Sequence, residues 1–219
     1  MKKRRVIAIL LAVVMSAALL TGCGSSVPAK ELVKGNLDAV FLGKYSTEYL
    51  KMVDIDETQA EKDYETGIDS EVEFFAQYFD IDLSLCGDSY REEIADMYRQ
   101  IYAKSKYEVG NETSNGDTYL VELTVYPIDL FDKIMNEDAE NFDTQWQSRI
   151  DNGEFDNATE EEYDQAWARA VIDLVKSKLP TIGYLEAQTI SVQVTKDDDD
   201  KYSIDSGDFD RIDALIIQY

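Results

Sequence analysis

The spacing of hydrophobic residues changes near residue 106 of this 219-residue chain, and this change constrains the fold more than any other feature. Up to Tyr102 the apolar residues recur every three or four positions, as on one face of an α-helix. From Tyr107 they alternate with polar residues, as in a half-buried β-strand. Asn115-Gly116 lies between two such alternating runs and is typical of a tight turn. The sequence therefore predicts helices followed by an antiparallel hairpin.

The same patterns predict the elements of the remaining chain. Thr58-Gln59-Ala60-Glu61 and Thr159-Glu160-Glu161-Glu162 match capping boxes that begin helices. The predicted fold class is α+β: N-terminal helices plus a four-stranded antiparallel sheet made of two hairpins, a long helical pair between them, and a short C-terminal helix. Helices are expected over 28–42, 47–53, 58–79, 89–102, 131–150, 159–179 and from 206; strands are expected from 107 and over 119–125, 189–195 and 202–204.

The first 26 residues have the composition of an export sequence. The cations Lys2-Lys3-Arg4-Arg5 precede the mostly apolar run Val6–Leu20, which is too short for a convincing transmembrane helix. Leu20-Thr21-Gly22-Cys23 then resembles a bacterial lipobox. The resemblance implies cleavage between Gly22 and Cys23 and a diacylglycerol on the Cys23 thiol. An ordinary signal peptide with an incidental cysteine is the alternative, and it would release the protein.

These observations divide the chain into three parts. Residues 1–22 are expected to be a lipoprotein signal peptide, and residues 23–28 a lipidated N-terminus with a short tether. Residues 29–219 are expected to form a single extracytoplasmic α+β domain, although the helical region up to Tyr102 could instead form a separate lobe. The predicted location is the cell membrane, lipid-anchored on its extracytoplasmic face.

Charge and composition exclude several classes of function. The 21 Lys and Arg include four before Cys23, so the cleaved chain would carry 17 of them against 45 Asp and Glu, a net charge of −28. Such a surface repels nucleic-acid phosphates, and membrane attachment is expected through the anchor alone. The absence of His excludes Ser-His-Asp, Cys-His and His-ligated zinc chemistry. Cys86 has no partner for a disulfide and is expected to be a small half-buried hydrophobic residue.

Several segments together resemble a family. They are Leu37–Tyr45, Lys106–Val109, Val125–Ile128 and the tail Thr189–Tyr219. With the export sequence, they resemble uncharacterised lipoproteins of Gram-positive bacteria. Some of these families look like cystatin-like or nuclear-transport-factor-like α+β folds, in which helices pack on a curved sheet. The double helix Phe131–Leu179 departs from the compact form of that fold.

Carboxylates are the abundant groups with catalytic potential. Asp54-Ile55-Asp56, Asp80-Ile81-Asp82 and Asp205-Ser206-Gly207-Asp208 could each present the paired acids of a hydrolase, but they stand at predicted helix starts, where acids cap backbone amides. The run Asp197, Asp198, Asp199 and Asp200 is a candidate site for a divalent cation, or a solvated turn. No cofactor is expected, because phosphate-binding loops and dinucleotide fingerprints are absent from the sequence.

The function expected from sequence is therefore coarse. It is a lipid-anchored cell-surface protein, more consistent with a non-catalytic binding or interaction module of the cell envelope than with an enzyme. Its partners would be the membrane, through the anchor, and a protein, peptide or small-molecule ligand. A carboxylate-dependent envelope hydrolase and a weak divalent-cation-binding surface protein are the alternatives.

Overall fold

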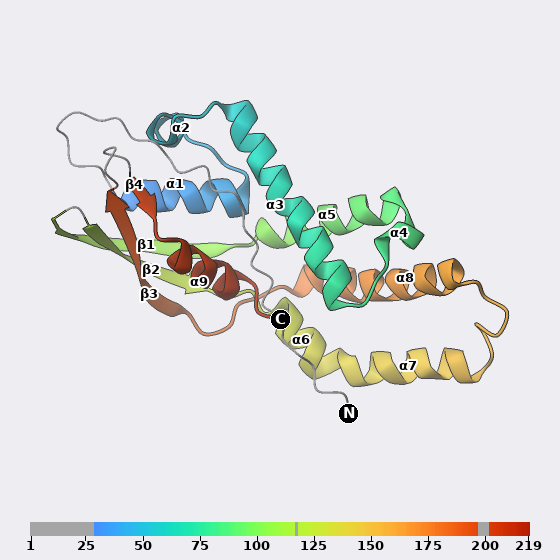
Figure 1. Ribbon diagram of the computed structural model, residues 1–219. Coiled ribbons are helices and arrows are strands. Elements are labelled where there is room, and N and C mark those ends of the chain that lie inside the picture. The colour runs from blue at the N-terminus through green and yellow to red at the C-terminus, as the bar shows by residue number, and fades with distance from the viewer. Residues whose placement is uncertain (1–28, 117, 197–201) are drawn as a thin grey trace.

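Helices come first in the computed structural model, which describes residues 29–116, 118–196 and 202–219 (Figure 1). The helix α1 ends where Gly43 takes a positive φ of 59°, as expected for a glycine after a helix. The five helices before the sheet are α1 (Ala29–Leu42), α2 (Thr47–Val53), α3 (Glu57–Tyr78), α4 (Leu83–Cys86) and α5 (Asp88–Tyr102).

Four antiparallel strands form one sheet in the order β1-β2-β3-β4. Their bounds are β1 (Lys106–Asn115), β2 (Thr118–Tyr126), β3 (Gln188–Lys196) and β4 (Tyr202–Ile204). The register of β1 on β2 shifts between Val109 and Glu112, which marks a β-bulge. Val121, Leu123 and Val192 point to the same face of the sheet and are fully buried.

Two helices cover this buried face. The helix α1 packs on β1 and β2, and the C-terminal helix α9 (Ser206–Ile216) packs on β2 and β3. Phe41 of α1 and Phe209 of α9 stack with ring centroids 6.2 Å apart, and Phe41 also meets the ring of Tyr102 of α5 edge-on. Each Å² of apolar surface buried in this way contributes about 25 cal/mol to stability. The core therefore joins the sheet to the N-terminal helices.

A pair of long helices extends beyond the sheet (Figure 1). We call α7 (Ala139–Asp151), α8 (Glu160–Lys178) and their connection the arm. The short helix α6 (Leu130–Lys133) and a π-helical segment, Ile134–Asp138, lead into α7, and the 3₁₀ turn Leu179–Thr181 follows α8. Trp146 and Trp167 hold the two arm helices together, with ring centroids 5.0 Å apart.

The predicted α+β class and element order are confirmed, but several details differ. The helix α3 begins at Glu57 and is capped by Asp56, whose carboxylate accepts a 2.8 Å hydrogen bond from the Gln59 amide, so Thr58 does not cap it. The predicted capping box at Thr159 is confirmed. In the helices expected over 131–150 and 159–179 the apolar spacing also predicts that Met135, Ile150 and Tyr163 are buried, but they are 42%, 36% and 38% exposed. The helix α8 packs against α4, α5 and α6 through Ala168, Val171, Ile172 and Val175, a face that leaves Tyr163 at its edge.

Among the described residues, every helix is too short or too polar to cross a bilayer.

Candidate binding groove

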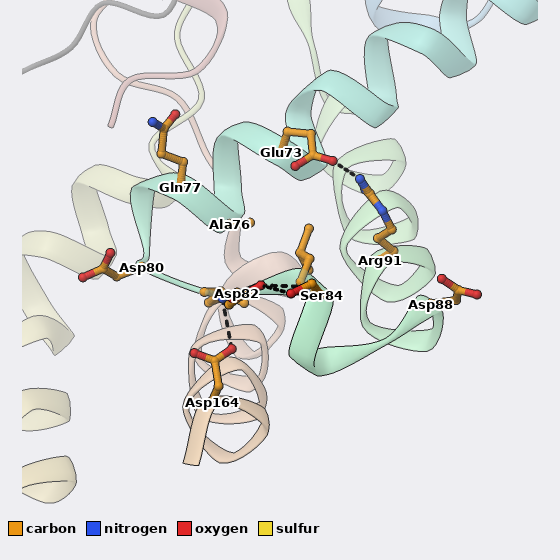
Figure 2. Close-up of a pocket in the computed structure, with 11 residues that line it drawn as sticks. Glu73, Ala76, Gln77, Asp80, Asp82, Ser84, Asp88, Arg91 and Asp164 are labelled. Carbon is orange, nitrogen blue, oxygen red and sulfur yellow. Dashed lines mark hydrogen bonds and ion pairs between the residues drawn. The ribbon is translucent and has the colours of Figure 1, made fainter. Parts of the chain in front are cut away.

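A groove of about 750 Å³ opens where α3 ends, between α4, the start of α5 and α8 (Figure 2). Its floor includes the apolar side chains of Ala76, Ile81 and Leu83. The remaining lining is polar and comprises Glu73, Gln77, Asp80, Asp82, Ser84, Asp88, Arg91 and Asp164. Residues 73–91 and the distant Asp164 therefore build one hollow.

Local hydrogen bonds shape the turn that forms one wall of the groove. Asp80 takes a left-handed conformation with φ 60°, and the Ile81 amide donates to the Ala76 carbonyl at 2.8 Å. The indole N–H of Trp167 in α8 donates a hydrogen bond to the Phe79 carbonyl at 2.7 Å, so the arm is bonded directly to the end of α3. Non-glycine residues enter the left-handed region at an energetic cost that the surrounding contacts must offset.

Asp82 and Asp164 tie the elements around the groove together. The Asp82 carboxylate accepts hydrogen bonds from the Ser84 amide at 2.9 Å and the Ser84 hydroxyl at 2.6 Å, and so caps α4. Hydrogen bonds from Ser84 hold the pKa of Asp82 below its usual value. The Asp164 carboxylate in turn accepts from the Asp82 amide at 3.0 Å, which joins α8 to the start of α4 (Figure 2).

Cys86 lies behind this wall as a buried free cysteine. Its thiol donates to the Asp164 carboxylate, with sulfur and oxygen 3.3 Å apart. Burial, followed by the carboxylates of Asp164 and Asp82, raises the pKa of the Cys86 thiol to about 12. The thiol therefore stays protonated at neutral pH and is not a nucleophile, which agrees with the sequence-based expectation of a small packed residue.

The groove has an uneven charge. Five carboxyl groups line it against one guanidinium, that of Arg91, which pairs with Glu73. Asp80 and Asp88 lie on opposite sides of the groove (Figure 2). This arrangement disfavours phosphate and other anionic ligands and favours ligands that carry a positive charge.

One acid of each pair singled out from sequence caps the start of a helix. Asp56, Asp82 and Asp205 each accept hydrogen bonds from amides in the first turn of α3, α4 and α9 respectively. Asp208 accepts from the Gln193 amide at 2.5 Å and pairs with Arg211 at 2.9 Å. These roles are structural, as the positions at helix starts predicted.

Two other carboxyl groups are perturbed, and sequence reasoning missed them. We call Glu71, Asp213, Tyr98 and Tyr102 the buried junction of α3, α5 and α9. Glu71 is 6% exposed and accepts a hydrogen bond from the Tyr102 hydroxyl at 2.5 Å. Burial, with the nearby Asp213, raises the pKa of Glu71 to about 8, and burial raises that of Asp213 to about 6. The Tyr98 hydroxyl forms a hydrogen bond with the Tyr219 hydroxyl, which links the junction to the C-terminal residue.

The remaining sequence-based candidates lie outside the described residues. They are Gly22 and Cys23 at the predicted cleavage point and the run Asp197, Asp198, Asp199 and Asp200. Within the described ranges, Cys, Asp and Glu side chains form no group of three or more that is placed to hold a metal ion.

Comparison with known proteins gives one structural likeness. No protein-family model matches the chain, and no curated protein matches it in sequence. The fold is similar to that of a candidate lipoprotein, ycdA, from Bacillus subtilis subsp. subtilis str. 168, with a TM-score of 0.58 at 15% sequence identity. The match covers 87% of this chain but 56% of that one. At this identity the likeness is one of fold.

Proposed function

We propose that this protein is a lipid-anchored cell-surface module that binds a ligand without catalysing a reaction. The observation that carries the anchor is the sequence Leu20-Thr21-Gly22-Cys23 directly after a cationic start and an apolar run. The structural neighbour, itself described as a candidate lipoprotein, supports the same class. The protein would then work on the extracytoplasmic face of the cell membrane. Membership of a cystatin-like or nuclear-transport-factor-like family stays a prediction.

Mass spectrometry of the protein isolated from a bacterial membrane tests the anchor. The expected N-terminus is Cys23 bearing a diacylglycerol, and Cys23→Ala should move the protein from the membrane fraction to the medium or to a soluble fraction. The matched control is Cys86→Ala, which removes the other cysteine and should leave the protein in the membrane. An unmodified Cys23 in the membrane-derived protein would contradict the proposal.

The groove is the site that the geometry favours for binding. Its apolar floor offers contact area, and its carboxylates supply a negative potential. The carboxylates of Asp82 and Asp164 accept hydrogen bonds from backbone amides, and Glu73 pairs with Arg91. Asp80 and Asp88 lie on either side of the groove (Figure 2). A short cationic peptide or a small amine with an apolar part fits this combination best.

Calorimetry with a tetralysine peptide, and with a neutral peptide of equal length, tests the groove. Binding of the cationic peptide should weaken with added salt and should fall several-fold in the variant Asp80→Asn/Asp88→Asn. The control is Glu140→Gln/Asp143→Asn on the exposed side of the arm, which removes two charges away from the groove. Equal loss in both double variants would show attraction by net charge alone and would contradict a site in the groove.

The two alternatives expected from sequence gain no support from a specific observation. In each acid pair that a carboxylate-dependent hydrolase would use, one member caps a helix instead. The candidate cation site at Asp197, Asp198, Asp199 and Asp200 lies outside the described residues, and weak divalent-cation binding stays a prediction that calcium calorimetry would check.

A further inference from the structure

Two hydrogen bonds define the direction in which α1 crosses the sheet. The Lys30 amide donates to the Glu112 carboxylate at 2.9 Å, and the Tyr107 hydroxyl donates to the Asp38 carboxylate at 2.7 Å. Tyr107 lies at the start of β1, whereas Glu112 lies in its second half, toward the turn into β2. The helix therefore runs antiparallel to β1 and begins at the hairpin end of the sheet.

The described strand ends that flank both hairpin connections lie at this same end. Asn115 pairs with Thr118 beside the first turn, and Thr118 pairs in turn with Thr195 at the end of β3. We call this end of the sheet, with the start of α1, the hairpin end. Figure 1 shows α4 and the arm on the opposite side of the molecule, beyond the other end of the sheet. The groove, which α4 and α8 help to line, belongs to that distal side.

The chain between Cys23 and α1 is too short to reach across the molecule. Six residue steps separate Cys23 from Ala29, and at most about 3.5 Å per step gives about 20 Å. The six residue steps of β1 from Lys106 to Glu112 already span about 20 Å. The 13 residues of α7 add about 20 Å more in the arm. The tip of the arm therefore lies beyond the reach of the tether.

We propose that the hairpin end of the sheet is the surface that faces the phospholipid headgroups, and that the arm and the groove face away from the membrane. This orientation rests on the lipid anchor proposed at Cys23. The described side chains at the hairpin end include the short, polar Thr113, Ser114 and Thr118 beside the acidic Glu112, so the anchor, and not charge attraction, holds this end near the headgroups. Leu120, 44% exposed on the outer face of β2, adds apolar contact area there.

In this orientation the hairpin end lies close to the membrane, and the arm and the groove lie farther from it. The short tether keeps the hairpin end near the bilayer. A partner in the cell envelope therefore meets the distal side first. The groove then opens where a ligand that approaches from the cell wall or the medium has access without displacing lipid.

Fluorescence energy transfer on vesicles of phosphatidylcholine and phosphatidylglycerol tests this orientation. The full-length protein is purified in its acylated form with Cys86→Ser, so that a single introduced cysteine carries the donor. One variant adds Ser114→Cys at the hairpin end, and the matched variant adds Asn157→Cys in the connection of the arm; both positions are exposed. With the acceptor on headgroups, transfer should be several-fold stronger from position 114 than from position 157. Circular dichroism confirms that each variant is folded.

Vesicle flotation separates the two proposals. Acylated protein that fails to float with the vesicles would overturn the anchor and, with it, the orientation. Protein that floats but transfers energy equally from both positions, or more strongly from position 157, would leave the anchor intact and overturn the orientation alone.

Discussion

The groove and the buried junction contain the same chemical group in opposite surroundings. In the groove, Asp82 and Asp164 accept hydrogen bonds from backbone amides close to solvent, and the pKa of Asp82 is lowered. In the junction, burial outweighs the hydrogen bond from Tyr102 and raises the pKa of Glu71 to about 8. Hydrogen bonds from the Ser84 hydroxyl and amide therefore favour the anion of Asp82, whereas burial favours the protonated forms of Glu71 and Asp213. The two regions should respond differently to pH.

The largest expected effect is a loss of stability as the pH rises, caused by the junction. A carboxyl group whose pKa is raised on folding stabilises the protein fully below its unfolded value, and that contribution is lost as the pH rises through the folded value. For Glu71 the window runs from about 4.5 to about 8. Each unit corresponds to about 1.4 kcal/mol, and about three units of the window lie above pH 5, so the free energy of unfolding should fall by about 4 kcal/mol between pH 5 and pH 9.

Urea denaturation at several pH values measures this loss. The window is favourable because the chain contains no His, so few other groups titrate between pH 6 and 9. Glu71→Gln keeps the acceptor for the Tyr102 hydroxyl and cannot ionise, so it should flatten the profile above pH 6. An equally steep profile in Glu71→Gln would show that the pH dependence arises elsewhere.

The order of elements could be predicted because hydrophobic spacing is a local property. The switch at residue 106, the hairpin at Asn115-Gly116 and the capping box at Thr159 each require only neighbouring residues, and the structure contains all three. The buried junction left a local trace as well. Glu71 falls on the apolar stripe of its helix, three residues after Ile68 and four before Phe75, which marks an acid on a buried face.

The groove could not be predicted, because its walls come from segments about 80 residues apart. Asp164 meets Asp82 only after α8 has packed against α4, a contact set by tertiary structure. The helix α4 has four residues, too few to show a helical period. The spacing of the carboxylates suggested caps correctly, but nothing local indicated that Asp80 and Asp88 would flank a common hollow.

A smaller loss of stability is expected from a substitution at Asp164, and this loss should not depend on pH. Asp164→Ala removes the acceptor for the Asp82 amide and for the Cys86 thiol, and should cost about 1–2 kcal/mol of unfolding free energy. This loss of unfolding free energy should be the same at pH 6 and pH 9, whereas the contribution of Glu71 should change between these pH values. The control is Asp143→Ala on the exposed side of the arm. A loss at Asp164 that grows with pH would contradict the distinction between the two regions.

The smallest effect is expected at Asp82, because its carboxylate caps only one short helix. Asp82→Ala should lower the melting temperature by about 2–4 °C, the usual cost of losing a helix cap in a protein of this size. Asp82→Asn should restore most of this, since an asparagine side chain also accepts from the Ser84 amide. If Asp82→Asn were as harmful as Asp82→Ala, the negative charge would matter more than the hydrogen bond. Asp82 would then stabilise the fold through its negative charge, whereas Glu71 stabilises it in the protonated form, and the contrast between the two regions would be sharper.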